Sequence, residues 1–369
     1  MNKLEQKLLS LTSGLTDLTG LQEQVQLMGK QHYGGVNYLP WPVLNDMYSY
    51  ADPVPGTRVA VMDRISYNAF CAMDCDVTLF DRGEGFLESN MKFDIIVGNP
   101  PFTESHGAKR WTLWEKFVNH SFYELSHDDT IIAMVTPNSW MSGGDLFRKF
   151  MRYGVAASLD PGKYFSQGST FSYWFMKKTV QTADFIVISD GVTHAISRNV
   201  MWLPREISAE SLSINQKVLF DHTDKFSFNR TCEYHTSKKD WQTVDGRYEV
   251  FHTLAQTLRT DVISQDISSM KVMFTLSGYS KPIVKNNTGC SQAAAYMIIA
   301  DHQAVNAESV FNSKFYQYLI NMNKWSGWND LKVLKNLPAV DLERSWTDAE
   351  LYQHFGLTAA EIQLVENHA

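Results

Sequence analysis

The chain has 369 residues, of which 44% are hydrophobic and 13% aromatic. This length suits two or three domains, and the composition argues against long disordered segments. The net charge of −7 argues against indiscriminate nucleic-acid binding. Residues 151–300, however, carry 16 Lys and Arg against 13 Asp and Glu, so this segment is where we expect an anionic partner to bind. No apolar run is long enough to span a membrane, and residues 1–28 lack the apolar centre of a signal peptide. We therefore expect a cytoplasmic protein.

The first predicted element is a helical arm over residues 1–29, where leucines recur every three or four positions. Short apolar runs then alternate with helix-like segments, which is typical of a parallel, doubly wound α/β sheet. The predicted strands of this sheet are 59–62, 77–80, 94–97 and 130–135. Further runs predict antiparallel strands that close one edge of the sheet, at 155–159, 171–176 and 185–188.

The rest of the chain predicts a separate organisation. Residues 201–322 are irregular and rich in Ser, Thr and aromatic residues, and we interpret them as a second, mixed α+β domain. Residues 323–369 form a predicted helical segment. Thr347 with Glu350, and Thr358 with Glu361, have the three-residue spacing of a capping box at a helix start. The first domain accordingly covers residues 30–200.

One tetrapeptide is the main candidate for a functional motif. Asn99-Pro100-Pro101-Phe102 directly follows the apolar run Ile95-Ile96-Val97 and Gly98. Ligands of open α/β sheets bind outside the carboxyl ends of the strands, so this tetrapeptide lies where a substrate is expected. A simple strand-ending turn is the alternative for the four residues alone, but the full run from Asp94 favours a functional site.

The composition of this tetrapeptide suits an exocyclic amine on a planar base. Such an amine is a poor nucleophile, because its lone pair is delocalised into the ring. Two acceptors that hold both amine hydrogens favour the nucleophilic form, and we assign these to the Asn99 side-chain oxygen and the Pro100 carbonyl. Pro101 adds rigidity and removes a donor, and Phe102 offers a stacking face. A base inside a duplex must be flipped out to reach such a pocket.

This run resembles the amino-methyltransferases of restriction–modification systems, and most closely the gamma-class DNA adenine-N6 enzymes. The resemblance covers most of the chain, but only the Asn-Pro-Pro-Phe motif is highly specific. It implies a Rossmann-like methyltransferase domain, S-adenosylmethionine as the cofactor and double-stranded DNA as the substrate. It also implies that residues 201–322 recognise the target sequence, that no metal is required, and that a restriction partner acts beside the protein in a bacterium or phage-infected host.

The sequence departs from this family in the cofactor region. The family carries a glycine-rich turn after its first strand, whereas residues 63–70 contain no glycine. A Gly-x-Gly pair occurs later, at Gly83 and Gly85, where a surface turn is the simpler interpretation. The interval from Asp63 to Asn99 is also too short for the usual set of strands. We therefore expect an abbreviated or degraded cofactor half.

Several residues are candidates for contacts to ligands. The resemblance places the segment with Tyr38 and Pro40 beside the methionine part of the cofactor. Asp63 and Asp81 end strands, where they can accept hydrogen bonds from the cofactor or remain solvated acids. Phe86 can line the cofactor adenine or belong to the core. Candidates for the second stacking face are Phe165, Phe171 and Tyr173, each with a core role as the alternative. Candidate phosphate contacts, each with a solvated role as the alternative, are Lys238, Lys239, Arg247 and Arg259.

The sequence thus predicts a site-specific DNA adenine methyltransferase that transfers a methyl group from S-adenosylmethionine to adenine N6. The missing glycines leave one alternative open, a catalytically inactive DNA-binding protein that acts as a decoy or specificity partner. A second alternative is a methyltransferase for RNA or for protein glutamine, because these substrates suit the same Asn-Pro-Pro chemistry.

Overall fold

The computed structural model describes residues 39, 41–106, 109–160, 170–231, 233–238, 240–264, 266–276, 281–325 and 331–368. The contacts divide the chain into two compact units, Met1–Asn199 and Val200–Ala369. The predicted N-terminal arm lies outside the described residues. Within the described part of the chain, no helix is long and apolar enough to cross a membrane.

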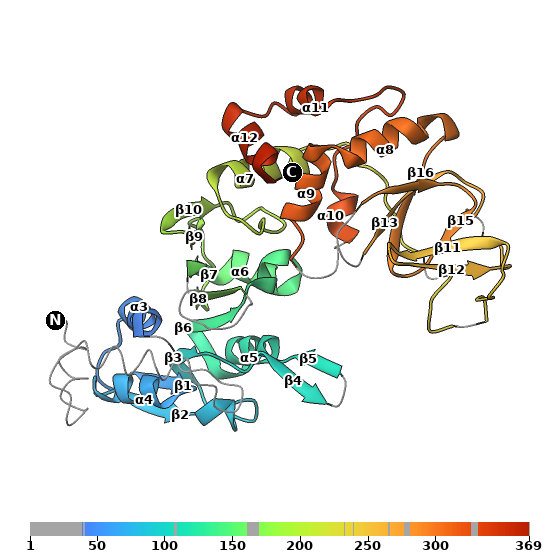
Figure 1. Cartoon of the computed structure of the whole chain (residues 1–369). Helices are drawn as coiled ribbons and strands as arrows, with labels where there is room; N and C mark the ends of the chain where they lie inside the picture. The colour runs from blue at the N-terminus through green and yellow to red at the C-terminus, as the bar shows by residue number, and fades with distance from the viewer. Residues whose placement is uncertain are drawn as a thin grey trace. The chain divides into compact units, whose positions relative to one another are not determined.

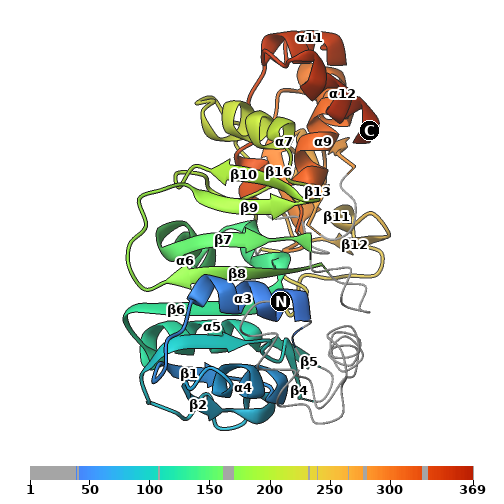
Figure 2. The same ribbon diagram turned by 90° about the vertical axis from the view of Figure 1, so that its left-hand side faces the viewer.

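The first unit is built on an eight-stranded sheet with the order β10-β9-β7-β8-β6-β3-β1-β2 (Figures 1 and 2). The strands are β1 (Arg58–Val61), β2 (Asp76–Leu79), β3 (Phe93–Gly98), β6 (Ser126–Pro137), β7 (Gly154–Ser158), β8 (Phe171–Lys177), β9 (Phe185–Ser189) and β10 (Val192–Ile196). β2, β1, β3 and β6 are parallel neighbours, and β8 is antiparallel to both β6 and β7. The predicted α/β class is confirmed. The three predicted closing strands form as β7, β8 and β9, but only β8 is antiparallel to both of its neighbours, whereas β7 and β9 pair parallel to each other.

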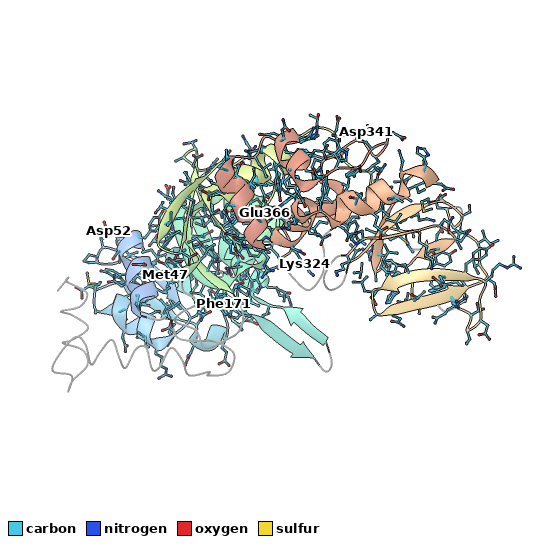
Figure 3. All side chains as sticks on the ribbon, turned by 45° about the horizontal axis from the view of Figure 1, so that its top comes forward. Met47, Asp52, Phe171, Lys324, Asp341 and Glu366 are labelled. Carbon is cyan, nitrogen blue, oxygen red and sulfur yellow. The ribbon has the colours of Figure 1, made fainter. Side chains whose placement is uncertain are left out.

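Helices cover both faces of this sheet (Figure 2). They are α3 (Trp41–Ala51), α4 (Arg64–Cys71), α5 (Trp114–His120), its π-helical continuation η2 (Ser121–Leu125) and α6 (Asp145–Tyr153), with short 3-10 turns η1 (Asp81–Gly83) and η3 (Asn138–Ser142). Met47 of α3 and Phe171 of β8 belong to one buried cluster with Val61 and Val97 (Figure 3). Strand β3 is buried on both faces at 95–98, which explains its continuous apolar run.

The abbreviated half of the sheet is visible in the strand order. Among the described residues, only β1 and β2 continue the sheet beyond β3. β1 pairs with β3 directly, in the register Val59 to Ile95 and Val61 to Val97. A hairpin of β4 (Thr103–His106) and β5 (Lys109–Thr112) follows the tetrapeptide and leads into α5.

Gly98 leaves room for the side chain of Met62, which follows the neighbouring strand β1. A Cβ atom at this position would lie 2.5 Å from the Met62 sulfur and 2.8 Å from its Cγ. Gly98→Ala is therefore expected to lower the free energy of unfolding by about 1–3 kcal/mol through overpacking. Urea denaturation measures this cost, and Met62→Ala in the same chain should recover part of it. A cost that Met62→Ala leaves unchanged would contradict the contact.

The second unit combines two small sheets with a helical cluster. Its elements are α7 (Ala209–Ile214), η5 (Asn215–Phe220), β11 (Tyr248–Thr253), β12 (Gln256–Thr260), β13 (Lys271–Thr275), β14 (Ile283–Lys285), β15 (Thr288–Cys290), β16 (Ala294–Ile298), η6 (Asp301–Gln303), α8 (Ala304–Asn312), α9 (Lys314–Met322), α10 (Leu331–Lys335), α11 (Asp348–His354) and α12 (Ala359–His368). The sheets have the orders β12-β11-β15 and β14-β13-β16. The capping boxes of Thr347 and Thr358 are confirmed by reciprocal hydrogen bonds with Glu350 and Glu361.

Candidate active site

The candidate site lies at the carboxyl edge of the sheet. β3 ends at Gly98, and Asn99 to Phe102 follow immediately. Because β1, β2, β3 and β6 are parallel, their carboxyl ends share this edge. Open α/β sheets bind their ligands here. The first residues after each of these strands are therefore the ones to examine.

Asn99 has a buried side chain without a hydrogen-bond partner. It is 1% exposed, and neither its Oδ1 nor its Nδ2 makes a hydrogen bond to any described residue. Leaving a buried polar group unpaired costs about 1–3 kcal/mol, and such groups are rare in folded proteins. The chain thus holds an unpaired amide directly after the end of β3, beside the buried Pro100.

Phe102 has one ring face covered. Its ring stacks on that of Phe171, with a centroid distance of 5.0 Å and an interplanar angle of 25°. Phe171 opens β8 and lies opposite Pro137 of β6, which brings three strand ends together. Phe171 therefore does not offer a second face for a base opposite Phe102: it stacks directly on Phe102 and is 2% exposed within the buried cluster, as the alternative core role predicted. Tyr173 instead donates its hydroxyl to Asp46 of α3 at 2.5 Å, and Phe165 lies outside the described residues.

Asn138 is a second buried amide at the same edge, and the sequence did not single it out. It follows Pro137 at the end of β6, is 6% exposed, and its Oδ1 has no partner among the described residues. Its backbone N–H donates to the carbonyl of Thr170 at 3.1 Å. The available signal was a polar residue directly after a buried parallel strand, the same signal that marks Asn99.

Asp63, a predicted cofactor residue, caps helix α4. Its Oδ1 accepts hydrogen bonds from the backbone N–H groups of Ile65 at 3.0 Å and Ser66 at 2.9 Å, and its Oδ2 accepts from the Ser66 hydroxyl at 2.6 Å. The carboxylate is 2% exposed, so it is not a solvated acid. Its contacts serve the start of the helix, which is a role typical of Asp at this position.

Burial gives Asp63 a pH signature. It raises the pKa of this carboxyl to about 6, against the opposing effect of the hydrogen bonds from Ser66 and Ile65. The folded chain thus binds the proton more tightly than the unfolded chain, whose value lies near 4. The free energy of unfolding should therefore fall as the pH rises from about 4 to about 6, by at most about 3 kcal/mol.

Asp63→Asn tests this dependence, since an amide oxygen still accepts from the helix but does not titrate. We expect urea denaturation of this variant to lose the decrease in stability between pH 4 and pH 6. Asp81→Asn serves as the matched control at the neighbouring strand end and should keep the decrease. An unchanged pH dependence in Asp63→Asn would assign the proton to another group.

The other predicted cofactor residues differ in their exposure and in their contacts. Asp81 is partly exposed and forms an ion pair with Arg64 at 3.3 Å. Phe86 is fully buried and stacks on Phe117 at 5.2 Å, so it packs in the core of the unit. Tyr38 and Pro40 lie outside the described residues.

The Gly-x-Gly pair lies in a turn that contacts the tetrapeptide. Gly83 has a φ of +78°, and a Cβ there would lie 2.8 Å from the Phe117 ring and 3.6 Å from Pro101 Cδ. Glycine is favoured at this conformation because it has no Cβ. The turn after β2 thus packs close to the Asn-Pro-Pro-Phe tetrapeptide.

The predicted phosphate contacts lie in the second unit, around the β11–β12 hairpin. Lys238 is exposed, and the Arg247 backbone N–H donates to Asp261 at 2.9 Å. Arg259 lies 3.7 Å from a Glu249 oxygen and donates to the carbonyl of Gly246. Lys239 lies outside the described residues. The Arg259 side chain is therefore partly engaged within its own hairpin.

One family profile matches part of the first unit. Residues 57–156 match the profile of the Eco57I restriction-modification methylases. No curated protein matches the chain.

Three solved structures show a limited likeness to the chain. The type I restriction-modification methyltransferase subunit from Streptococcus thermophilus is 15% identical, with a TM-score of 0.38 over 49% of this chain and 53% of that one. The type IIG restriction endonuclease BpuSI is 11% identical, with a TM-score of 0.36 over 94% and 63%. The type IIL enzyme MmeI, solved in complex with DNA, is 11% identical, with a TM-score of 0.37 over 66% and 46%.

The chain spans about half the length of the first solved structures that it matches. The resemblance to restriction–modification methyltransferases is confirmed over residues 57–156, which match the Eco57I restriction-modification methylases.

Proposed function

We propose that the protein is a DNA adenine-N6 methyltransferase that uses S-adenosylmethionine. The unpaired, buried amide of Asn99 at the end of β3 carries this proposal. A folded chain keeps such a group at a cost of about 1–3 kcal/mol, and an exocyclic amine of a flipped base offers the hydrogen-bond donors that it lacks. The match of residues 57–156 to restriction-modification methylases supports the same reaction.

The residues of the tetrapeptide divide the work at the base. Asn99 Oδ1 and the Pro100 carbonyl each accept one hydrogen of the adenine amine, which turns its lone pair away from the ring. Pro101 keeps the loop rigid. Phe102, fixed from behind by Phe171, offers its free face to the base. The reaction replaces one N–H bond of the amine by an N–CH₃ bond and releases a proton.

The described residues fit the cofactor in part. S-adenosylmethionine supplies an activated methyl group on a sulfonium centre. Asp81 keeps a partly exposed carboxylate at the end of β2, where it can accept hydrogen bonds from ribose hydroxyls. Asp63 and Phe86 hold α4 and the aromatic core in place. The second unit, with Lys238, Arg247 and Arg259, is assigned to double-stranded DNA.

A second candidate is an inactive methyltransferase-like protein that binds DNA as a decoy or specificity partner. Two features favour it: the Asp63 carboxylate already accepts three hydrogen bonds from the start of α4, and the turn after β1 has no glycine. Calorimetry with S-adenosylmethionine separates the two candidates, because only the enzyme should bind the cofactor below millimolar concentration.

The reaction itself is tested with labelled S-adenosylmethionine and DNA that lacks N6-methyladenine. Digestion to nucleosides and mass spectrometry should give N6-methyladenine. Label found in a methylated cytosine would contradict the proposed base. Label found only with RNA or protein substrates would contradict the proposed substrate class.

A further inference from the structure

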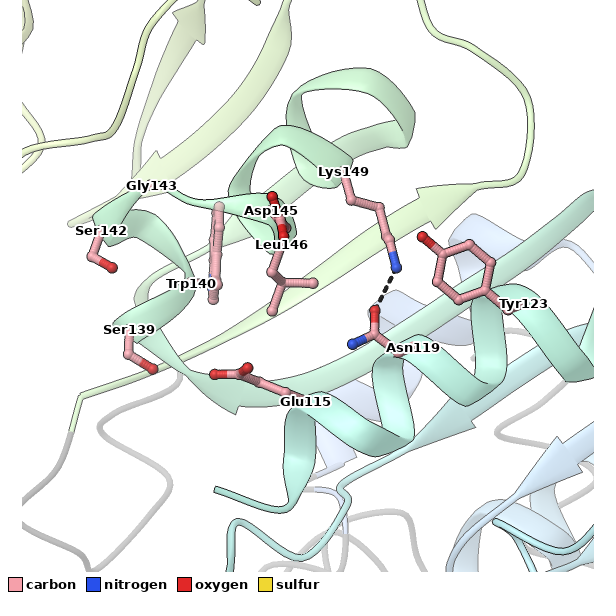
Figure 4. A pocket seen from close by; sticks show the side chains of 10 residues that line it. All are labelled: Glu115, Asn119, Tyr123, Ser139, Trp140, Ser142, Gly143, Asp145, Leu146 and Lys149. Carbon is pink, nitrogen blue, oxygen red and sulfur yellow. Dashed lines mark hydrogen bonds between the residues drawn. The ribbon is translucent and has the colours of Figure 1, made fainter. Parts of the chain in front are cut away.

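A pocket lies between two helices of the first unit, apart from the tetrapeptide (Figure 4). Its volume is about 630 Å³, within the range of roughly 300–1,000 Å³ that is typical of small-molecule sites. The walls come from α5 with η2 on one side and from η3 with α6 on the other. The lining residues are Glu115, Asn119, Tyr123, Ser139, Trp140, Ser142, Gly143, Asp145, Leu146 and Lys149.

Lys149 brings a buried amine to this pocket. The residue is 9% exposed, and its Nζ donates to Asn119 Oδ1 at 2.5 Å. The ammonium also lies 4.1 Å from the centre of the Tyr123 ring and 4.8 Å from that of Phe122. An ammonium has three donors, and within the described structure this one has a single acceptor and no carboxylate within ion-pair distance.

Glu115 brings the opposite charge to the facing wall. Its carboxylate makes no hydrogen bond or ion pair with any residue that the structure describes, and partial burial raises its pKa. Asp145, the other acid of the lining, is already paired with Arg148. The pocket therefore holds one cation and one anion that have no ion-pair partner among the described residues, on α6 and α5, and Leu146 projects into the space between them (Figure 4).

A nucleotide is the ligand class that complements this arrangement. Its phosphate matches a buried ammonium, and the N–H groups of its base match a carboxylate acceptor. Tyr123 is 59% exposed, and the Lys149 ammonium lies over one face of its ring, so a base can stack on the other face. Ser139 and Ser142 add hydroxyls suited to a sugar. An amino acid also carries both charges, but it has no planar ring system for the aromatic wall and is much smaller than the pocket.

We propose that the α5–α6 pocket binds one nucleotide unit, with its phosphate on Lys149 and the N–H groups of its base on Glu115. This site is separate from the target-base site and does not depend on the proposed methyl transfer. The nucleotide comes either from a DNA strand that passes the carboxyl edge of the sheet or from the pool of free nucleotides. The chemistry is the same for both sources.

The environment of Lys149 predicts that nucleotide binding changes the number of bound protons, which can be measured. Burial lowers the pKa of Lys149 to about 8, and Asp145 opposes this shift. Glu115 and Tyr123 line the same pocket, and Lys178 lies 5.4 Å from the Phe122 ring, which Lys149 also contacts. A bound phosphate stabilises the ammonium and raises this pKa again. Nucleotide binding at pH 8.5 should therefore take up protons.

Calorimetry with the full chain tests the proposal. The Asn99→Ala background removes the acceptor of the target-base site, and the ligands are dAMP, dCMP and a single-stranded pentanucleotide. Lys149→Met should weaken nucleotide binding at least tenfold. It should also abolish proton uptake on binding, which is measured by comparing binding enthalpies in buffers of different ionisation enthalpy. Glu115→Gln should weaken dCMP binding. Lys116→Met, an exposed lysine on the same helix outside the lining, should leave binding unchanged.

The outcomes distinguish the two sources and the failure of the proposal. A pentanucleotide that binds at least tenfold more tightly than dAMP assigns the pocket to DNA, whereas the reverse assigns it to free nucleotides. The proposal is overturned if none of the three ligands binds at millimolar concentration. It is also overturned if Lys149→Met, shown by circular dichroism to be folded, binds like the parent. Neither result changes the expectation for Asn99, so the proposed methyl transfer is tested separately.

Discussion

Asn99→Ala is expected to reduce methyl transfer to DNA by at least 10²–10³-fold, the range of about 3–4 kcal/mol seen when one preorganised hydrogen-bonding group is removed from an active site. Asn99 Oδ1 has no partner within the described protein, so its acceptor is available to the substrate amine. For the same reason, Asn99→Ala should not lower the free energy of unfolding, because no hydrogen bond of the folded chain is lost and the cost of about 1–3 kcal/mol for burying an unpaired amide is removed. Asn99→Ala should thus lose methyl-transfer activity without losing stability.

The measurement combines initial rates of labelled methyl transfer with urea denaturation of the same samples. Asn99→Asp is the matched control, since it keeps an acceptor oxygen at the same place and should retain more activity than the alanine variant. A large loss of stability in Asn99→Ala would show that the amide serves the fold. An alanine variant as active as the parent would remove Asn99 from the reaction.

Phe102→Ala is expected to lower kcat/KM for DNA by roughly 10–100-fold, since base stacking on an aromatic ring contributes about 1–3 kcal/mol. The Phe102 ring is held by Phe171 at 5.0 Å, so the platform is positioned before any base arrives. Phe102→Tyr preserves the ring and should stay within several-fold of the parent. The measurement is the rate of transfer at varied DNA concentration.

Phe171→Leu separates stacking on the base from packing. Phe171 is 2% exposed and belongs to the buried cluster under α3, so its loss should lower stability more than it lowers kcat/KM in the folded protein. A Phe102→Ala variant with parental kcat/KM would contradict the platform role. A Phe171→Leu variant with a greater loss of kcat/KM than Phe102→Ala would place the base on Phe171 instead.

The sequence was informative where its signals are local. The run before Asn99 predicted a buried parallel strand, and β3 is that strand. The spacing of Thr347 and Glu350 predicted a capping box, which the hydrogen bonds confirm. The short interval from Asp63 to Asn99 predicted an abbreviated sheet, because chain length limits how many strands fit.

The sequence was less informative where contacts join distant segments. The capping role of Asp63 was missed because a strand end and a helix start coincide at that residue. The stacking of Phe102 on Phe171 depends on the antiparallel pairing of β6 and β8, which no local pattern specifies. Glu115 and Lys149 meet in one pocket only after α5 and α6 are placed.

The most direct test of the central claim is methylation-sensitive sequencing of DNA from cells that express the protein, beside cells that express Asn99→Ala. The account predicts N6-methyladenine at a defined sequence in the first sample and its absence in the second, at equal levels of folded protein. Equal adenine methylation in both samples, or none in either, would contradict the claim that Asn99 holds the amine of an adenine for methyl transfer.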